Sequence, residues 1–256
     1  MKKIALITGA SKGIGKSLAE EFAKNKYSLI LIARTKSELE NLQEQLLKKY
    51  KCNSKILALD LADPESTNTI LLTFKNELQN IEILINNAGF GISKKFSDML
   101  DKDVKDMMAV NIQTLTNLTY SILPYMIKNK KGKILNVSSI AAYSPGPFMA
   151  MYYASKAYVS SFSEALNEEY KNDGVLVSAL CPGITQSFFH QRAGRNKMTS
   201  GYFPIMSSES VAQIAYKKLM KNQKVIVSGY LNRVLVCLMK ITPNFILSKI
   251  IAKINI

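Results

Sequence analysis

Two adjacent tyrosines stand just ahead of a lysine in the stretch MYYASK, residues 151–156. Residues three and four positions apart share one face of a helix, so Tyr152 and Tyr153 can each approach Lys156. A free phenol, with a pKa of ~10, is a poor base at neutral pH. An ammonium group one turn away is expected to lower that pKa and to turn the phenol into a general acid or base. The local spacing does not choose between the two tyrosines.

A glycine-rich turn, TGASKGIG at residues 8–15, joins a short apolar run to a helical pattern. Its glycines let the backbone approach a ligand closely, and the amides at the start of the next helix suit a phosphate. The spacing differs from the usual GxGxxG, and a turn that binds nothing remains the alternative. Arg34 directly follows the second apolar run, at the strand end where NAD-specific sites usually carry an acid. With Lys12, Arg34 can pair with a 2′-phosphate, which favours NADP(H) over NAD(H).

Short apolar runs alternate with longer amphipathic segments along the chain. The runs are 3–8, 28–33, 55–59, 82–86, 133–138, 175–181 and 224–228, and helical patterns fall near 17–25, 36–50, 64–79, 101–128, 151–172 and 208–221. Runs without polar alternation are typical of strands covered on both faces. The pattern therefore predicts an α/β fold, a doubly wound, Rossmann-like parallel sheet of about seven strands with helices on both faces. Residues 1–228 are predicted to form one catalytic domain.

The last segment, 229–256, is apolar with isolated basic residues and without acids. Pro243 is expected to divide it into two short helices. This helical extension can belong to the same domain, pack against another subunit or lie in a membrane interface. Packing is the favoured alternative. No run reaches the ~18 uncharged apolar residues of a membrane span.

The composition excludes several chemistries. Three cysteines lack metal-ligand or paired spacing, and His190 is the only histidine, so neither a metal site nor a histidine triad is predicted. The apolar run near the N-terminus is too short for a signal peptide. The net charge of +15 suits an anionic partner, but the lysines are scattered and solubility explains them as well. A cytoplasmic protein that does not bind nucleic acid is expected, with peripheral contact at a membrane surface as the alternative.

Several motifs occur together in one order. They are TGASKGIG at 8–15, Asp60 with Leu61, NNAG at 86–89, Asn111, NVSS ending at Ser139, YYASK at 152–156 and PG at 182–183. Together they resemble the short-chain dehydrogenase/reductase family of the TGxxxGxG and Tyr-x-x-x-Lys type, from residue 3 to about residue 228. The resemblance implies an oxidoreductase that transfers hydride between NADPH and a carbonyl or secondary alcohol.

The resemblance also assigns catalytic residues. It selects Tyr152, four residues before Lys156, as the general acid and base, and Ser139, thirteen residues before Tyr152, as the group that binds the carbonyl oxygen. Tyr153 becomes a packing residue. Lys156 is expected to lower the pKa of Tyr152 and to hold the nicotinamide ribose, and Asn111 to position a water of a proton relay.

The predicted cofactor contacts combine the glycine loop and Arg34 with residues that the resemblance adds. In chain order they are Gly9, Ser11, Lys12, Gly13, Ile14, Gly15, Arg34, Asp60, Leu61, Asn87, Ala88, Gly89, Tyr152, Lys156, Pro182, Gly183, Thr185 and Ser187. The apolar stretch 140–152 and the loop 187–203 are expected at the substrate, which points to an apolar, acyl-chain-like carbonyl compound. A homodimer or homotetramer is implied by the resemblance. The alternatives are a catalytically silent NADP-binding regulator and a basic membrane-surface protein.

Overall fold

A seven-stranded parallel sheet forms the centre of the protein, in a computed structural model that describes residues 3–186 and 205–255. The strand order is β3-β2-β1-β4-β5-β6-β9. The strands are β1 (Ile4–Thr8), β2 (Ser28–Ala33), β3 (Ser54–Ala58), β4 (Ile81–Asn86), β5 (Gly132–Val137), β6 (Val175–Cys181) and β9 (Val225–Val227). The predicted α/β sheet is thereby confirmed. Because the order reverses between β1 and β4, the carboxyl ends of these two strands border a crevice suited to a ligand.

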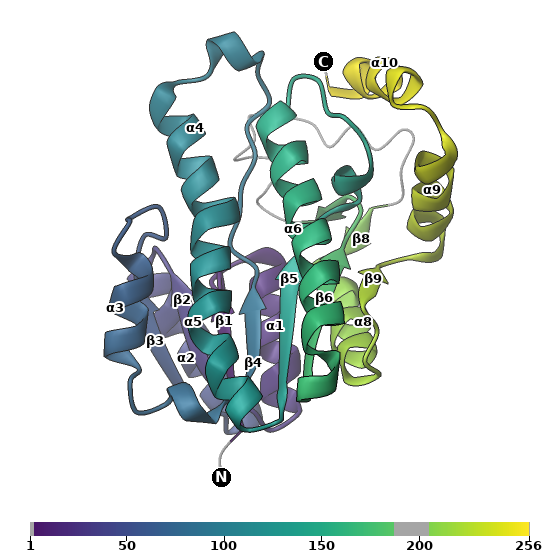
Figure 1. Ribbon diagram of the computed structural model, residues 1–256. Coiled ribbons are helices and arrows are strands. Elements are labelled where there is room, and N and C mark those ends of the chain that lie inside the picture. The colour runs from purple at the N-terminus through teal and green to yellow at the C-terminus, as the bar shows by residue number, and fades with distance from the viewer. Residues whose placement is uncertain (1–2, 187–204, 256) are drawn as a thin grey trace.

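Helices cover both faces of the sheet (Figure 1). One face carries α1 (Gly13–Lys24), α2 (Lys36–Tyr50) and α8 (Ser208–Met220), and the other carries α3 (Ser66–Thr73), α5 (Thr114–Lys128) and α6 (Ala150–Tyr170). Successive β1 residues point to opposite faces: Ile7 packs in the core under α1, whereas Leu6 packs in the core under α5. Burial on both faces explains why these strands show no polar alternation.

Two predicted helices differ from expectation. The pattern at 64–79 forms only α3, followed by a turn and a short 3-10 helix, η1 (Leu78–Asn80). The pattern at 101–128 is broken into α4 (Asp101–Met108) and α5 by a π-helical turn, η3 (Ala109–Gln113). π-Turns inside helices are frequent at functional sites, and this one carries Asn111.

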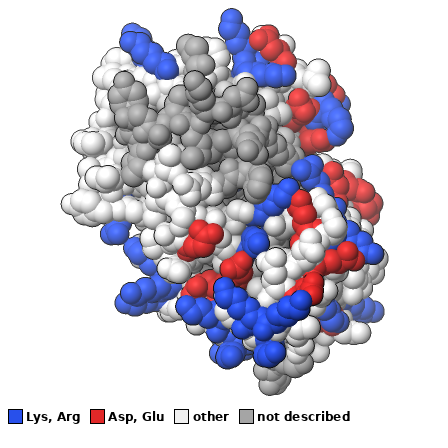
Figure 2. All heavy atoms as spheres, turned by 180° about the vertical axis from the view of Figure 1, so that it is seen from behind, with Lys and Arg blue, Asp and Glu red and all other residues white. Residues whose placement is uncertain are grey.

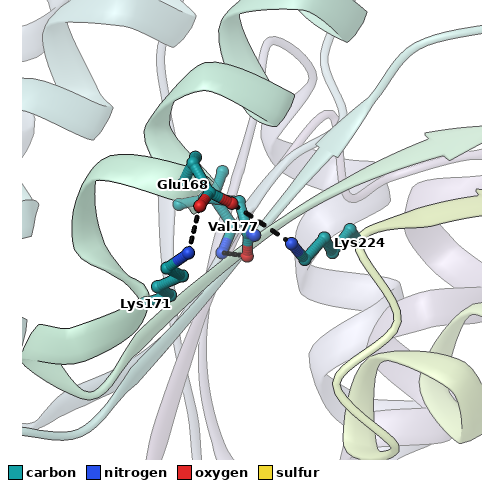
Figure 3. A network of polar contacts seen from close by, with 5 residues as sticks. Glu168, Lys171, Val177 and Lys224 are labelled. Atoms are coloured by element: carbon teal, nitrogen blue, oxygen red, sulfur yellow. Dashed lines mark hydrogen bonds and ion pairs between the residues drawn. The ribbon is translucent and has the colours of Figure 1, made fainter.

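The end of α6 is tied to the neighbouring strands (Figure 3). Glu168 forms ion pairs with Lys171 and with Lys224, the latter at 3.3 Å, just before β9. The Val177 amide of β6 donates a hydrogen bond to the Asn167 side chain at 3.4 Å. These contacts fix the helix that carries Tyr152 and Lys156 relative to β6.

The tail forms two helices, α9 (Tyr230–Ile241) and α10 (Asn244–Asn255), on either side of Pro243 as predicted. They run along one edge of the molecule and turn over the carboxyl ends of the strands (Figure 1). A small two-stranded sheet, β7 (Thr185–Gln186) and β8 (Met206–Ser207), was not predicted, because segments of two residues carry no periodic signal. None of the helices in the described ranges is long and apolar enough to cross a membrane.

Candidate active site

A cavity of about 580 Å³ lies at the carboxyl ends of the central strands. Its floor and walls come from segments far apart in the chain, including the glycine turn, the segment after β4, the start of α6 and the tail. The predicted residues that line it are Gly9, Ser11, Lys12, Gly13, Ile14, Arg34, Asp60, Leu61, Asn87, Ala88, Gly89, Ser139, Tyr152, Lys156, Pro182, Gly183 and Thr185. The fold thus brings together nearly every residue that the sequence singled out.

The glycine turn enters α1 through residues in a left-handed conformation. Gly9 and Gly13 have φ of +63° and +53°, which glycine adopts at no steric cost. No side chain caps the start of α1, so its first amides are available to a ligand. With the positive end of the helix dipole, this cradle fits the pyrophosphate of a dinucleotide.

Gly15 does not line the cavity but holds the turn together. A Cβ at this position would lie 2.1 Å from the Gly9 carbonyl oxygen and 2.4 Å from the Asn87 side-chain nitrogen. That nitrogen donates hydrogen bonds of 3.0 Å to the carbonyls of Thr8 and Gly9. Asn87 therefore clamps the glycine turn to the end of β4, a contact that its predicted role at the cofactor did not anticipate.

We expect Gly15→Ala to destabilise the protein by about 1–3 kcal/mol, because the added methyl group overpacks the turn. Dinucleotide affinity should fall at least about tenfold, since the turn must shift to admit the methyl group. Urea unfolding and titration of cofactor fluorescence measure the two effects. The matched control is Lys24→Ala at the exposed end of the same helix. Unchanged affinity in Gly15→Ala would show that the turn does not hold the cofactor.

The part of the cavity next to the glycine turn and the end of β2 carries two basic residues and an acid. Arg34 and Lys12 line it together with Glu38 of α2. Lys12 forms an ion pair with Glu38 at 2.6 Å, and this bond, aided by Ser11, lowers the pKa of Glu38. Glu38 was not predicted at the site, because it lies four residues beyond Arg34, past the end of the second strand. A helix start that folds back over the turn is visible only in three dimensions.

Tyr152 and Ser139 lie side by side in the cavity wall. Ser139 is held by the Ala141 amide, which donates a hydrogen bond of 3.1 Å to its hydroxyl oxygen. Tyr152 is half-buried, and desolvation of its phenol raises the pKa to about 12, although a hydrogen bond with Ser139 acts in the opposite direction. The net shift is opposite in direction to the lowering of the Tyr152 pKa that was expected from Lys156, because desolvation disfavours the phenolate.

Lys156 is buried below the tyrosine. Its ammonium nitrogen donates a hydrogen bond of 2.8 Å to the Val137 carbonyl and lies 5.7 Å from the centre of the Tyr152 ring. Burial lowers the pKa of Lys156 to about 8. This separation allows cation–π attraction to the ring.

Asn111 occupies the centre of a polar cluster next to Lys156. Its side chain accepts a hydrogen bond of 3.0 Å from the Phe90 amide and donates to the Phe90 carbonyl at 2.8 Å. It also donates to Ser155 at 3.1 Å. A Cβ at Gly89 would lie 3.2 Å from both the Asn111 oxygen and the Lys156 nitrogen, so the two groups converge on one point.

Ser138 and Tyr153, which are adjacent in sequence to Ser139 and Tyr152, make other contacts. Ser138 is buried and donates a hydrogen bond of 2.8 Å to the Lys156 carbonyl. The Tyr153 ring packs on Gly146, where a Cβ would lie 2.1 Å from a ring carbon. Ser187 and the basic and aromatic residues of the loop 187–203 lie outside the described residues.

The tail supplies part of the cavity wall. Met239 of α9 and Ile251, Ile254 and Asn255 of α10 line it. The Asn255 side chain donates a hydrogen bond of 2.9 Å to the Pro147 carbonyl, and Ser93 donates to the Asn255 carbonyl at 3.4 Å. These residues were not predicted at the site, because no local sequence pattern indicates that a C-terminal helix packs over strands from much earlier in the chain.

Comparison with known proteins identifies the class. The sequence pattern of the short chain dehydrogenase family matches residues 3–198, so the chain belongs to this family. The family consists of NAD(P)-dependent oxidoreductases of the short-chain dehydrogenase/reductase type. The chain is 36% identical over 182 residues to the very-long-chain 3-oxoacyl-CoA reductase of Bos taurus, covering 70% of this chain and 58% of the relative. The human protein of that name is 36% identical over 184 residues, with the same coverage. The chain therefore matches less than two thirds of the length of these curated relatives.

Solved structures support the same assignment. A short-chain dehydrogenase from Sphingobium yanoikuyae in complex with NADPH is 28% identical, with a TM-score of 0.83 and coverage of 94% of this chain and 96% of the other. The bulky-bulky ketone specific alcohol dehydrogenase from Comamonas testosteroni is 27% identical, with a TM-score of 0.79 and coverage of 94% and 95%.

Proposed function

We propose that the chain reduces a carbonyl group on an apolar, acyl-chain-like substrate, with NADPH as the hydride donor. The observation that carries the proposal is the hydrogen-bonded pair of Ser139 and Tyr152 in the wall of a cavity that also contains a dinucleotide cradle. The sequence relatives named for 3-oxoacyl-CoA reduction favour a 3-oxoacyl thioester as the first substrate to test. Apolar wall residues, Met149, Met239 and Ile251, are consistent with an acyl chain.

The protein's own groups would act on the substrate oxygen. The Ser139 and Tyr152 hydroxyls donate hydrogen bonds to the carbonyl oxygen and hold it in one position. When bound, NADPH supplies the hydride that reduces the carbonyl carbon. Tyr152 then gives its proton to the oxygen, and the product is a secondary alcohol. A phenol with a pKa of about 12 is protonated at neutral pH, so Tyr152 carries the proton that carbonyl reduction requires.

After each turnover Tyr152 must regain a proton, and the buried polar cluster of Lys156 and Asn111 provides the route. Lys156, with a pKa lowered to about 8, can exchange a proton near neutral pH. Asn111 lies next to it with its side chain held by Phe90 and Ser155. We assign Lys156 to the ribose hydroxyls of the cofactor and to proton resupply, and Asn111 to a relay water.

The choice of NADPH rests on the charges in the part of the cavity next to the glycine turn and the end of β2. Arg34→Ala should raise the KM for NADPH about tenfold to a hundredfold, as expected for a lost charged hydrogen bond, and should change the KM for NADH little. Glu38→Gln should act in the opposite direction, because Lys12 is then released from its carboxylate for the 2′-phosphate. Steady-state kinetics with both cofactors measure both effects. Equal effects on NADPH and NADH would contradict the assignment.

The reaction is tested by following NADPH absorbance with aldehydes, steroids, quinones and 3-oxoacyl thioesters of increasing chain length. Turnover that grows with chain length supports the proposal. A silent NADP-binding regulator would bind NADPH tightly and reduce none of these compounds. That outcome would favour a nucleotide-binding regulator over an enzyme as the function of the chain.

A further inference from the structure

The outward side of α9 is an exposed apolar stripe. Leu231, Val234, Leu238 and Ile241 are 61%, 42%, 52% and 78% exposed. Their spacing of three, four and three residues places them along one face of the helix. The opposite side of α9 is buried, with Val236 in a core cluster. The fold therefore uses only the inner side of the helix, and the outer stripe contributes nothing to the core.

The apolar surface continues onto α10. Phe245, Ile246 and Ile250 are 66%, 39% and 49% exposed. Lys249 and Lys253 are exposed on the same helix. Exposed aliphatic and aromatic side chains gathered on two consecutive helices differ from the scattered apolar residues of an ordinary surface. We refer to these seven apolar side chains of α9 and α10 as the tail surface.

The charges near the tail surface have one sign. The segment 229–256 contains Arg233, Lys240, Lys249 and Lys253 and no acid. In the view from behind, the edge turned toward the upper left is mostly uncharged, with basic side chains above and below it (Figure 2). An apolar face bordered by cations is the pattern of a helix that lies in a membrane interface. The whole chain, with a net charge of +15, is attracted to the same kind of surface.

We propose that the tail surface docks the protein on a membrane that contains anionic lipids. The apolar side chains enter the headgroup region, and Lys249 and Lys253, which are exposed on α10, contact lipid phosphates. A second copy of the chain fits less well, because a symmetric contact through this surface would bring the cations of both copies together, and residues 229–256 contain no acid to pair with them. Anionic lipid satisfies both the apolar and the basic residues.

The tail surface and the cavity share the same two helices. Met239 is buried one residue after the exposed Leu238, and it lines the cavity. Ile251 stands in the same relation to the exposed Ile250 of α10. One thickness of helix thus separates the proposed lipid contact from the substrate space. An acyl substrate could pass from the membrane to the cavity without crossing water, an extension that rests on the proposed function, whereas the docking itself does not.

The docking is tested by flotation of the full-length protein with phosphatidylcholine vesicles with and without phosphatidylglycerol. We expect binding to the anionic vesicles that weakens with salt. The double variant Leu238→Glu with Ile241→Glu should bind at least about tenfold more weakly, since it places charge in the apolar stripe. The matched control is Tyr120→Glu, which replaces an 80% exposed apolar residue on α5, away from the tail.

A second variant, Lys249→Gln with Lys253→Gln, keeps the apolar stripe and should lose about tenfold in binding to anionic vesicles only. Circular dichroism and the reduction of a short water-soluble ketone should be unchanged in both variants. Absence of binding to anionic vesicles would overturn the proposal. So would a double glutamate variant that binds vesicles normally but changes the oligomeric state in sedimentation, since the partner would then be a second copy. If the proposed function is wrong but the docking is right, the unmodified protein will bind anionic vesicles and will not reduce the ketone.

Discussion

Tyr152→Phe is expected to lower carbonyl reduction by at least about 10²–10⁴-fold while NADPH still binds. The substitution removes one hydroxyl and keeps the ring, so the cavity wall retains its shape. Ser139 keeps the hydrogen bond from the Ala141 amide and is not left without a partner. What disappears is the proton donor next to the substrate oxygen. Single-turnover kinetics with NADPH, together with cofactor binding by fluorescence, separates this loss from a loss of affinity.

The adjacent tyrosine provides the control. Tyr153→Phe removes a hydroxyl from the neighbouring ring, which packs on Gly146. Activity in this variant should remain within about threefold of the parent, because packing is provided by the ring. If Tyr153→Phe abolished turnover and Tyr152→Phe did not, the assignment of the general acid would be reversed.

Lys156→Met is expected to abolish turnover and yet leave the protein at least as stable at pH 7. The lysine is 5% exposed, and burial lowers its pKa from 10.5 to about 8. Burying the charged form therefore costs about 3 kcal/mol of folding free energy at neutral pH. Methionine fills a similar volume without charge. The activity is lost because both the ribose contact and the proton resupply assigned to Lys156 are removed.

The pH dependence of stability has a definite sign. Below pH 8, Lys156 is charged in both the folded and the unfolded chain, and the burial penalty is complete. Between pH 8 and 10.5 the folded protein has released the proton that the unfolded chain still binds, so the free energy of unfolding rises with pH. Relative to Lys156→Met, the parent should gain up to about 3 kcal/mol across this window.

Urea unfolding of both proteins at pH 7 and pH 10 measures this difference. Other groups that titrate in the window are common to the two proteins and cancel. A parent that becomes less stable relative to Lys156→Met as the pH rises would contradict the assigned pKa direction. An active Lys156→Met variant would contradict the catalytic assignment.

Local patterns in the sequence were sufficient for the sheet, for most helices and for the positions of the motifs. Strands buried on both faces must be apolar throughout, and helices on a sheet must be apolar on one side, so the strands and the sides of helices such as α2 could be assigned from residue types. The glycine turn was recognisable because Gly9 and Gly13 adopt a left-handed conformation that few other residues tolerate. The choice between Tyr152 and Tyr153 required the resemblance, because both spacings fit a helix.

Only the tertiary structure decided the electrostatics and the cavity wall. The pKa of Tyr152 rises because the phenol is buried, and burial depends on segments that no local window contains. The same holds for the ion pair between Lys12 and Glu38, which joins the glycine turn to α2. The residue types at these two positions do not by themselves indicate that the side chains meet. Asn255 reaches the Pro147 carbonyl across 108 positions of chain. Desolvation and long-range contact are properties of the folded arrangement, whereas periodicity and turn chemistry are properties of neighbouring residues.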